Sequence, residues 1–171
     1  MGRRTEMALA LEKFVTPETG FPETFATPET GAPDRPWGSD ANSEMDLCVV
    51  FTSVKATLAA LRTAGALASR LRCRITLVVP QVVPYPLPLT SPPVLIDLAE
   101  RQFRVLASQS PVETIVRIYL CRDREDALTQ MLKPRSLLVV GGRRRWWPTR
   151  ETRLARRLRR AGHEVVFVET E

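Results

Sequence analysis

The chain has 171 residues, 44% of them apolar, and a formal net charge of +6, a size and composition that fit one ordinary domain plus a tail. No apolar run approaches the ~20 residues that a membrane-spanning helix needs, and no secretory apolar core follows Met1. We therefore expect a cytoplasmic protein that does not enter a membrane.

Charge and cysteines are unevenly distributed. Residues 1–44 hold four basic and eight acidic residues, a net charge of −4, so residues 45–171 carry +10. Three cysteines, Cys48, Cys73 and Cys121, lie in or beside apolar segments and form no C-x-x-C pair. We expect buried, reduced thiols rather than a metal or redox site.

Residues 1–44 are expected to be a disordered leader. A Pro-Glu-Thr pattern recurs at residues 16–20, 22–24 and 27–31. Proline removes backbone donors, glycine raises the entropy cost of ordering, and few large apolar groups offset that cost. The one ordered element that we consider within the leader is a brief helix from Leu9 to Val15.

From residue 45 onward, five apolar runs alternate with four helical patterns. The expected strands are residues 47–51, 75–79, 112–121, 136–140 and 165–168. The expected helices are residues 55–73 after a Ser53 cap, 91–108 with Ser91 as cap and Pro92 in the first turn, a short helix capped by Asp123 and stopped by Pro134, and 150–161 before Gly162. Strict alternation of this kind predicts a parallel sheet in a small doubly wound α/β domain.

Prolines interrupt the region after the second expected strand. Pro80 is expected to end that strand because it cannot donate to a sheet ladder. The six prolines from Pro80 to Pro93 predict a stiff, extended loop without regular structure.

The fourth strand leads into an unusual loop. Four apolar residues, Leu137 to Val140, predict a strand buried on both faces, and two glycines, three arginines, two tryptophans and Pro148 follow it. In parallel α/β proteins, ligands bind at the carboxyl ends of such strands. This loop is therefore the first place to look for a site.

Residues 46–170 resemble the universal stress protein family in the pattern and order of their segments. The likeness is carried by the strand ending near Ser53, by residues 74–80 and the proline-rich loop, and by residues 122–127, 137–141 and 158–168. The resemblance implies a five-stranded parallel sheet in the order 3-2-1-4-5, of the adenine nucleotide alpha hydrolase-like type. It also implies a stress-response role and a homodimer formed through the last strand.

The nucleotide-binding branch of that family carries a glycine, two residues, a second glycine, nine residues, then glycine and serine or threonine. Gly141 matches the first glycine, Arg144 replaces the second, and alignment by the last helix places Glu151 and Thr152 at the final pair. The aspartate that usually ends the first strand has no counterpart before Ser53. The resemblance thus implies a degenerate nucleotide site with ATP as its candidate ligand.

The candidate site lies where the first and fourth expected strands end and diverge, a switch point in strand order. It would use Ser53, Val79 by its backbone, Gly141, Gly142, Arg143 and Thr152. Glycines let backbone N–H groups approach phosphates, and nearby arginines add charge.

The last expected helix carries a basic stripe. Arginines recur near helical spacing at Arg150, Arg153, Arg156, Arg157 and Arg160. A solvated face is the ordinary explanation, and binding of nucleic acid or an acidic protein is the alternative. Beside them, Trp146 and Trp147 are expected to form a hydrophobic lid or a dimer contact, ahead of stacking on bases.

No catalytic constellation emerges from the sequence. The serines Ser53, Ser69, Ser91 and Ser136 lack a nucleophile-elbow setting, and there is no Walker-type lysine loop. His163 is expected to be structural. We expect a non-catalytic stress-response or signalling domain, and keep two alternatives: a basic module for nucleic acid or an acidic partner, and an ATP binder with weak ATPase activity.

Overall fold

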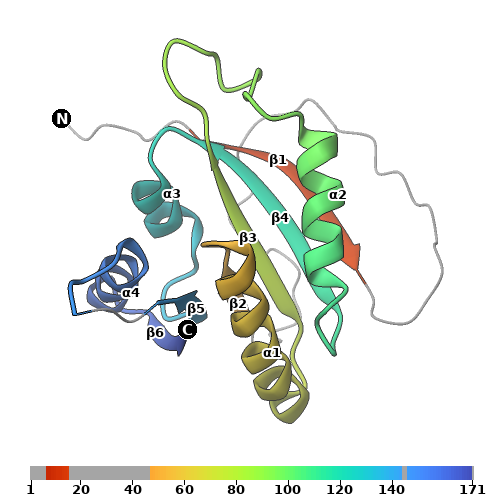
Figure 1. Cartoon of the computed structure of the whole chain (residues 1–171), viewed down its shortest axis with the longest axis vertical. Helices are drawn as coiled ribbons and strands as arrows, with labels where there is room; N and C mark the ends of the chain where they lie inside the picture. Colours follow the sequence, from red (N-terminus) through yellow and green to blue (C-terminus); the bar gives the residue numbers. More distant parts are fainter. Residues whose placement is uncertain (1–6, 16–46, 144–145, 171) are drawn as a thin grey trace.

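The computed structural model describes residues 7–15, 47–143 and 146–170. Its strands are β1 (Met7–Val15), β2 (Leu47–Val50), β3 (Ile75–Val82), β4 (Thr114–Cys121), β5 (Leu137–Gly142) and β6 (Glu164–Glu169). Its helices are α1 (Val54–Leu71), α2 (Ile96–Ala107), α3 (Arg124–Met131) and α4 (Arg150–Arg160) (Figure 1).

The strands form one six-stranded, mostly parallel sheet in the order β1-β4-β3-β2-β5-β6. β2 to β6 run parallel, and β1 pairs antiparallel with β4. The expected α/β class is confirmed, whereas the expected five-stranded sheet is wrong because a sixth strand extends it beyond β4.

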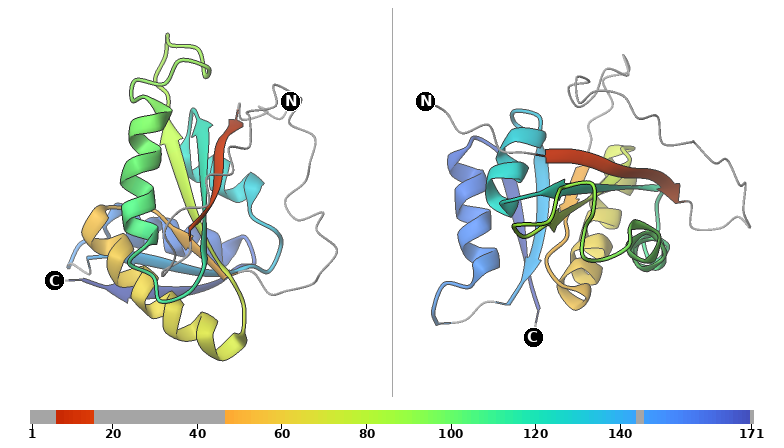
Figure 2. Two further views of the ribbon diagram at one scale, coloured as in Figure 1. Left: turned by 90° about the vertical axis from the view of Figure 1, so that its right-hand side faces the viewer. Right: turned by 90° about the horizontal axis from the view of Figure 1, so that it is seen from above.

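Helices cover both faces of the sheet. Side chains alternate between the two faces along every strand, so one strand can contribute to two separate clusters. Leu47 and Val49 of β2 pack into one cluster with residues of α1 and α2. Cys48 and Val50 pack into the other with residues of α3 and α4. The left view of Figure 2 shows α1 and α2 on one side of the sheet and α3 on the other.

The N-terminal element is a strand and not a helix. β1 pairs with β4 from Met7 opposite Cys121 to Val15 opposite Thr114, so the brief helix expected over these residues is wrong. The ladder satisfies backbone hydrogen-bonding groups that would otherwise be unpaired at the edge of β4. Local propensity cannot predict this stabilisation, because it comes from a segment distant in the chain. An ion pair of 2.8 Å between Glu12 and Arg117 crosses the same two strands. The rest of the expected leader lies outside the described residues.

β3 runs through Pro80 instead of ending there. The carbonyl of Val78 accepts a hydrogen bond from the Phe51 N–H, so the backbone polar groups of Val78 point towards β2. The backbone of Pro80, two residues further on, points towards the same side. β2 pairs with β3 only as far as Val78, so no ladder partner requires a donor at Pro80. The missing N–H therefore costs no sheet bond, and β3 continues beside β4 to Val82.

The segment between β3 and α2 is irregular, as expected, but α2 begins later than expected. The N-cap is Leu95, without a side-chain cap bond, in place of Ser91. Pro93 disfavours helical geometry at the residue before it, which delays the helix. Arg122 fixes the loop by donating to the carbonyls of Val83 and Leu87, each at 2.8 Å, and lies 4.2 Å from the centre of the Tyr85 ring.

The other helix ends follow the sequence signals. The Ser53 and Asp123 side chains accept bonds from first-turn N–H groups of α1 and α3, as expected for caps. Gly162 ends α4 with a φ of 90°, the left-handed conformation expected there. All three cysteines are buried and none forms a disulfide, which confirms that part of the expectation.

His163 is buried just after Gly162, and its Nδ1 has no hydrogen-bond partner. Burial lowers its pKa below the usual 6.5 because the charged imidazolium loses solvation. The unfolded chain therefore binds a proton more readily than the folded one as the pH falls through about 6.5.

We expect the free energy of unfolding to fall with decreasing pH below about 6.5, with a slope that cannot exceed ~1.4 kcal/mol per pH unit for this one proton. Denaturant titrations between pH 5.5 and 7.5 measure it. His163 is the sole histidine of the chain, so His163→Gln should flatten that dependence. An unchanged pH profile in the variant would show that the imidazole is not the titrating group.

Candidate functional site

A cleft of about 400 Å³ opens at the topological switch point of the parallel sheet, at the carboxyl ends of β2 and β5. β2 pairs with β3 on one side and with β5 on the other. The chain leaves β2 into α1 and leaves β5 towards α4, on opposite faces of the sheet. The cleft is lined by Ser53, Lys55, Ala56, Gly142, Arg143, Thr149, Glu151 and Thr170.

Of the candidate residues, the structure brings Ser53, Gly142 and Arg143 to this cleft. Val79 does not line it; that residue is 2% exposed inside β3, in register with Ile118 of β4. Thr152 also lies off the lining, and its hydroxyl is 3.0 Å from that of Thr149.

Gly141 lies behind the cleft, packed against the start of α1. A Cβ at this position would stand 2.0 Å from the carbonyl oxygen of Ala56, a backbone atom. The Thr52 hydroxyl also donates to the Gly141 carbonyl at 2.8 Å. Glycine is therefore required here by helix packing.

Gly142 is similarly confined, on the side of α4. A Cβ there would lie 2.6 Å from Cβ of Glu151 and 3.0 Å from Phe167 Cζ. Both glycines belong to β5, in register with Val168 and Glu169 of β6, and neither has a positive φ. This does not fit a family-type glycine cradle, because the space that phosphates would approach is filled by the protein itself.

The two helices that border the cleft use some of their own N-terminal donors. Ser53 accepts from the Ala56 N–H at 3.4 Å, and Thr149 accepts from the Thr152 N–H at 3.3 Å. The Thr149 hydroxyl also lies 3.3 Å from the Arg143 carbonyl, and donation to it closes the base of the loop. The cleft is thus preformed by capping bonds.

The charged groups of the cleft favour an anion. Lys55 and Arg143 contribute two positive charges, and Glu151 contributes one negative charge. The dipoles of α1 and α4 add partial positive charge where each helix begins. Glu151 opposes this field, so the arrangement suits a small anion held by cations more than a polyphosphate on backbone amides.

Sequence reasoning did not propose Lys55, Thr149 or Thr170 as site residues. Lys55 follows a recognisable helix cap, and Thr149 precedes the expected last helix, so both carried a local signal. Thr170 carried none, because its place beside α1 depends on how β6 pairs with β5.

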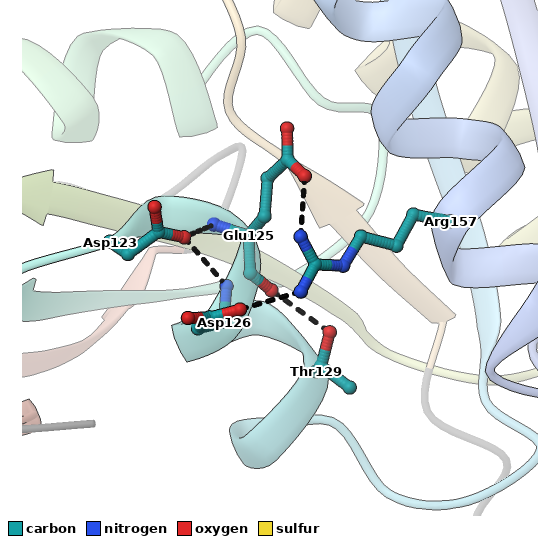
Figure 3. Close-up of polar contacts among 5 residues, drawn as sticks. All are labelled: Asp123, Glu125, Asp126, Thr129 and Arg157. Carbon is teal, nitrogen blue, oxygen red and sulfur yellow. Dashed lines mark hydrogen bonds and ion pairs between the residues drawn. The ribbon is translucent and has the colours of Figure 1, made fainter. Parts of the chain in front are cut away.

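Arg157 differs from the other arginines of α4. Its guanidinium donates to Glu125 Oε2 at 2.7 Å and to Asp126 Oδ1 at 2.5 Å, both in the first turn of α3 (Figure 3). The hydrogen bond that Arg157 donates to Glu125 is the largest cause that raises the Arg157 pKa above its usual value. Arg157 therefore joins two helices and differs from the other arginines of the stripe by its two carboxylate partners, although its side chain is 47% exposed.

The remaining arginines of the expected stripe are exposed. Within the described part of the chain, the side chains of Arg150, Arg153, Arg156 and Arg160 have no ion-pair or hydrogen-bond partner. Trp146 is 94% exposed and Trp147 78% exposed, so the expectation of a hydrophobic lid is wrong.

The buried nucleophiles are poorly suited to chemistry. Burial raises the pKa of the Cys121 thiol to about 11 and that of the Tyr119 phenol to about 12, so neither is ionised near neutral pH. Over residues 7–15, 47–143 and 146–170, no cluster of three His, Cys, Asp or Glu side chains could hold a metal ion. In the same residues, no helix combines the length and apolarity needed to cross a membrane.

Comparison with known proteins returned no match to any protein-family model, curated protein or solved structure. The likeness to universal stress proteins therefore stands on the residues of the chain alone.

Gly141→Ala should destabilise the protein by about 3 kcal/mol without any ligand present, because the added methyl group meets the Ala56 carbonyl. Urea denaturation measures the change. Gly162→Ala is the matched control: nothing lies within 4 Å of its Cβ position, so only the positive φ is strained, at a cost of about 1 kcal/mol. Wild-type stability in Gly141→Ala would contradict the packing role.

Proposed function

We propose that this chain is a non-catalytic, universal stress protein-like binding domain whose switch-point cleft takes a small anionic ligand. The observation that supports this most directly is the cleft itself, with Lys55 and Arg143 in its lining between the starts of α1 and α4. Its volume of about 400 Å³ falls within the usual range of small-molecule sites.

In this proposal the ligand is held differently from a family-type nucleotide. Ser53 offers a hydroxyl, Arg143 offers an exposed cation at the mouth, and the glycines supply only close packing. A phosphate or phosphomonoester fits these donors better than the triphosphate of ATP, since Glu151 lies where further negative charge would come.

Isothermal titration with inorganic phosphate, AMP and ATP tests the proposal. We expect phosphate or AMP to bind and Arg143→Gln to weaken that binding about tenfold, as loss of one charge-assisted contact predicts. Arg101→Gln removes an equal charge from the exposed surface of α2 and should leave binding unchanged. Failure of all three ligands to bind would reject the cleft, and ATP turnover that Arg143→Gln abolishes would favour the ATPase alternative.

The proposal extends to assembly and location. β6 is the outer strand beside β5, so two copies could pair there as a homodimer, as the resemblance implies. Light scattering should then give twice the mass of 19.2 kDa, and a monomer at micromolar concentration would contradict it. Three buried thiols without a disulfide suit the reducing cytoplasm that we propose as its compartment.

A further inference from the structure

The outer side of α4 and the two tryptophans shortly before it carry exposed side chains that do not line the cleft. We define the α4 basic surface by Trp146, Trp147, Arg150, Arg153, Arg156 and Arg160. From this surface we propose that the protein binds single-stranded nucleic acid, with phosphates on the arginines and bases on the tryptophans.

The arginines are placed to follow a backbone. Leu154, Ala155 and Leu158 bury the opposite side of α4 against the sheet, which leaves Arg153, Arg156 and Arg160 on its outer side at helical spacing. These side chains are exposed and have no partner in the described chain. Free guanidinium groups in a row are the usual means of tracking phosphates.

Arg157 shows that pairing was available on this helix. Glu125 and Asp126 neutralise Arg157 where α4 faces α3 (Figure 3). The described residues place no such carboxylate against Arg150, Arg153, Arg156 or Arg160, so the positive field persists on the outer side alone. The positive charge of these four arginines is therefore not neutralised by carboxylates of the described fold.

The tryptophans decide which polyanion fits. Trp146 and Trp147 expose 94% and 78% of their surface immediately before α4, although burial of such rings is ordinarily favourable. Unpaired bases offer flat faces that stack on indole rings, whereas an acidic peptide offers charge without them and a duplex hides its bases. Charge and aromatic rings together thus favour a single strand.

The test uses the full chain with fluorescently labelled 20-mers of dT and U, a 20-mer duplex and polyglutamate, followed by anisotropy and by tryptophan quenching. We expect both single strands to bind and quench, and the duplex and polyglutamate to bind at least tenfold more weakly. Four phosphate contacts predict a slope of log Kobs against log salt of about −3.

Two variants separate the contributions. Trp146→Ala with Trp147→Ala should weaken single-strand binding by at least tenfold with little change in salt slope. Arg153→Gln with Arg156→Gln and Arg160→Gln should flatten the slope by about 2. Arg62→Gln, Arg70→Gln and Arg101→Gln remove the same charge from exposed positions on α1 and α2, and should preserve the slope. All the changed side chains are exposed, and circular dichroism confirms folding.

Three outcomes would overturn the proposal: no single-strand binding at low salt, equal binding of duplex with no effect of the tryptophan variant, or polyglutamate binding as tight as that of dT. The last would assign the surface to an acidic protein partner. Arg143 lies in the cleft and outside the α4 basic surface, so phosphate titration of the arginine variants distinguishes failure here from failure of the cleft.

Discussion

The domain depends on the burial of β2 from both sides. Leu47 and Val49 point into one core cluster and Cys48 and Val50 into the other, all at 1% exposure or less. This strand is buried at all four residues and lies centrally, with β3 and β5 as neighbours. The connections that leave β2 and β5 then pass to opposite faces, and the cleft opens between them.

Glycine at the end of β5 illustrates how one residue type can serve two different purposes. In a phosphate loop, glycine admits a ligand to the backbone; here Gly141 admits the backbone of α1, and Gly142 admits the side chain of Glu151. The two glycines of β5 thus allow the protein itself to fill the space that a phosphate would occupy in such a loop. Lys55 and Arg143 remain in the lining of the cleft, which is why we propose a small anion as its ligand.

Two surfaces meet at the loop between β5 and α4. Thr149 caps α4 and donates to the Arg143 carbonyl, and both residues line the cleft, whereas the exposed Trp146 and Trp147 between them do not. Burial of Leu154, Ala155 and Leu158 sets the rotation of α4, and Arg157 pairs with α3 while Arg153, Arg156 and Arg160 face solvent.

The sequence determined the α/β alternation and three of the four helix starts within a residue or two, because apolar runs and caps act locally: Ser53 and Asp123 accept the bonds expected of them. Tertiary structure alone decided the rest. β1 became a strand because the edge of β4 offered backbone partners, and Pro80 stayed in β3 because its neighbour β2 had ended. Tertiary structure also decided that neighbouring segments fill the space beside Gly141 and Gly142, that Trp146 is exposed and that Thr170 lines the cleft. Each of these features depends on contacts between segments distant in the chain.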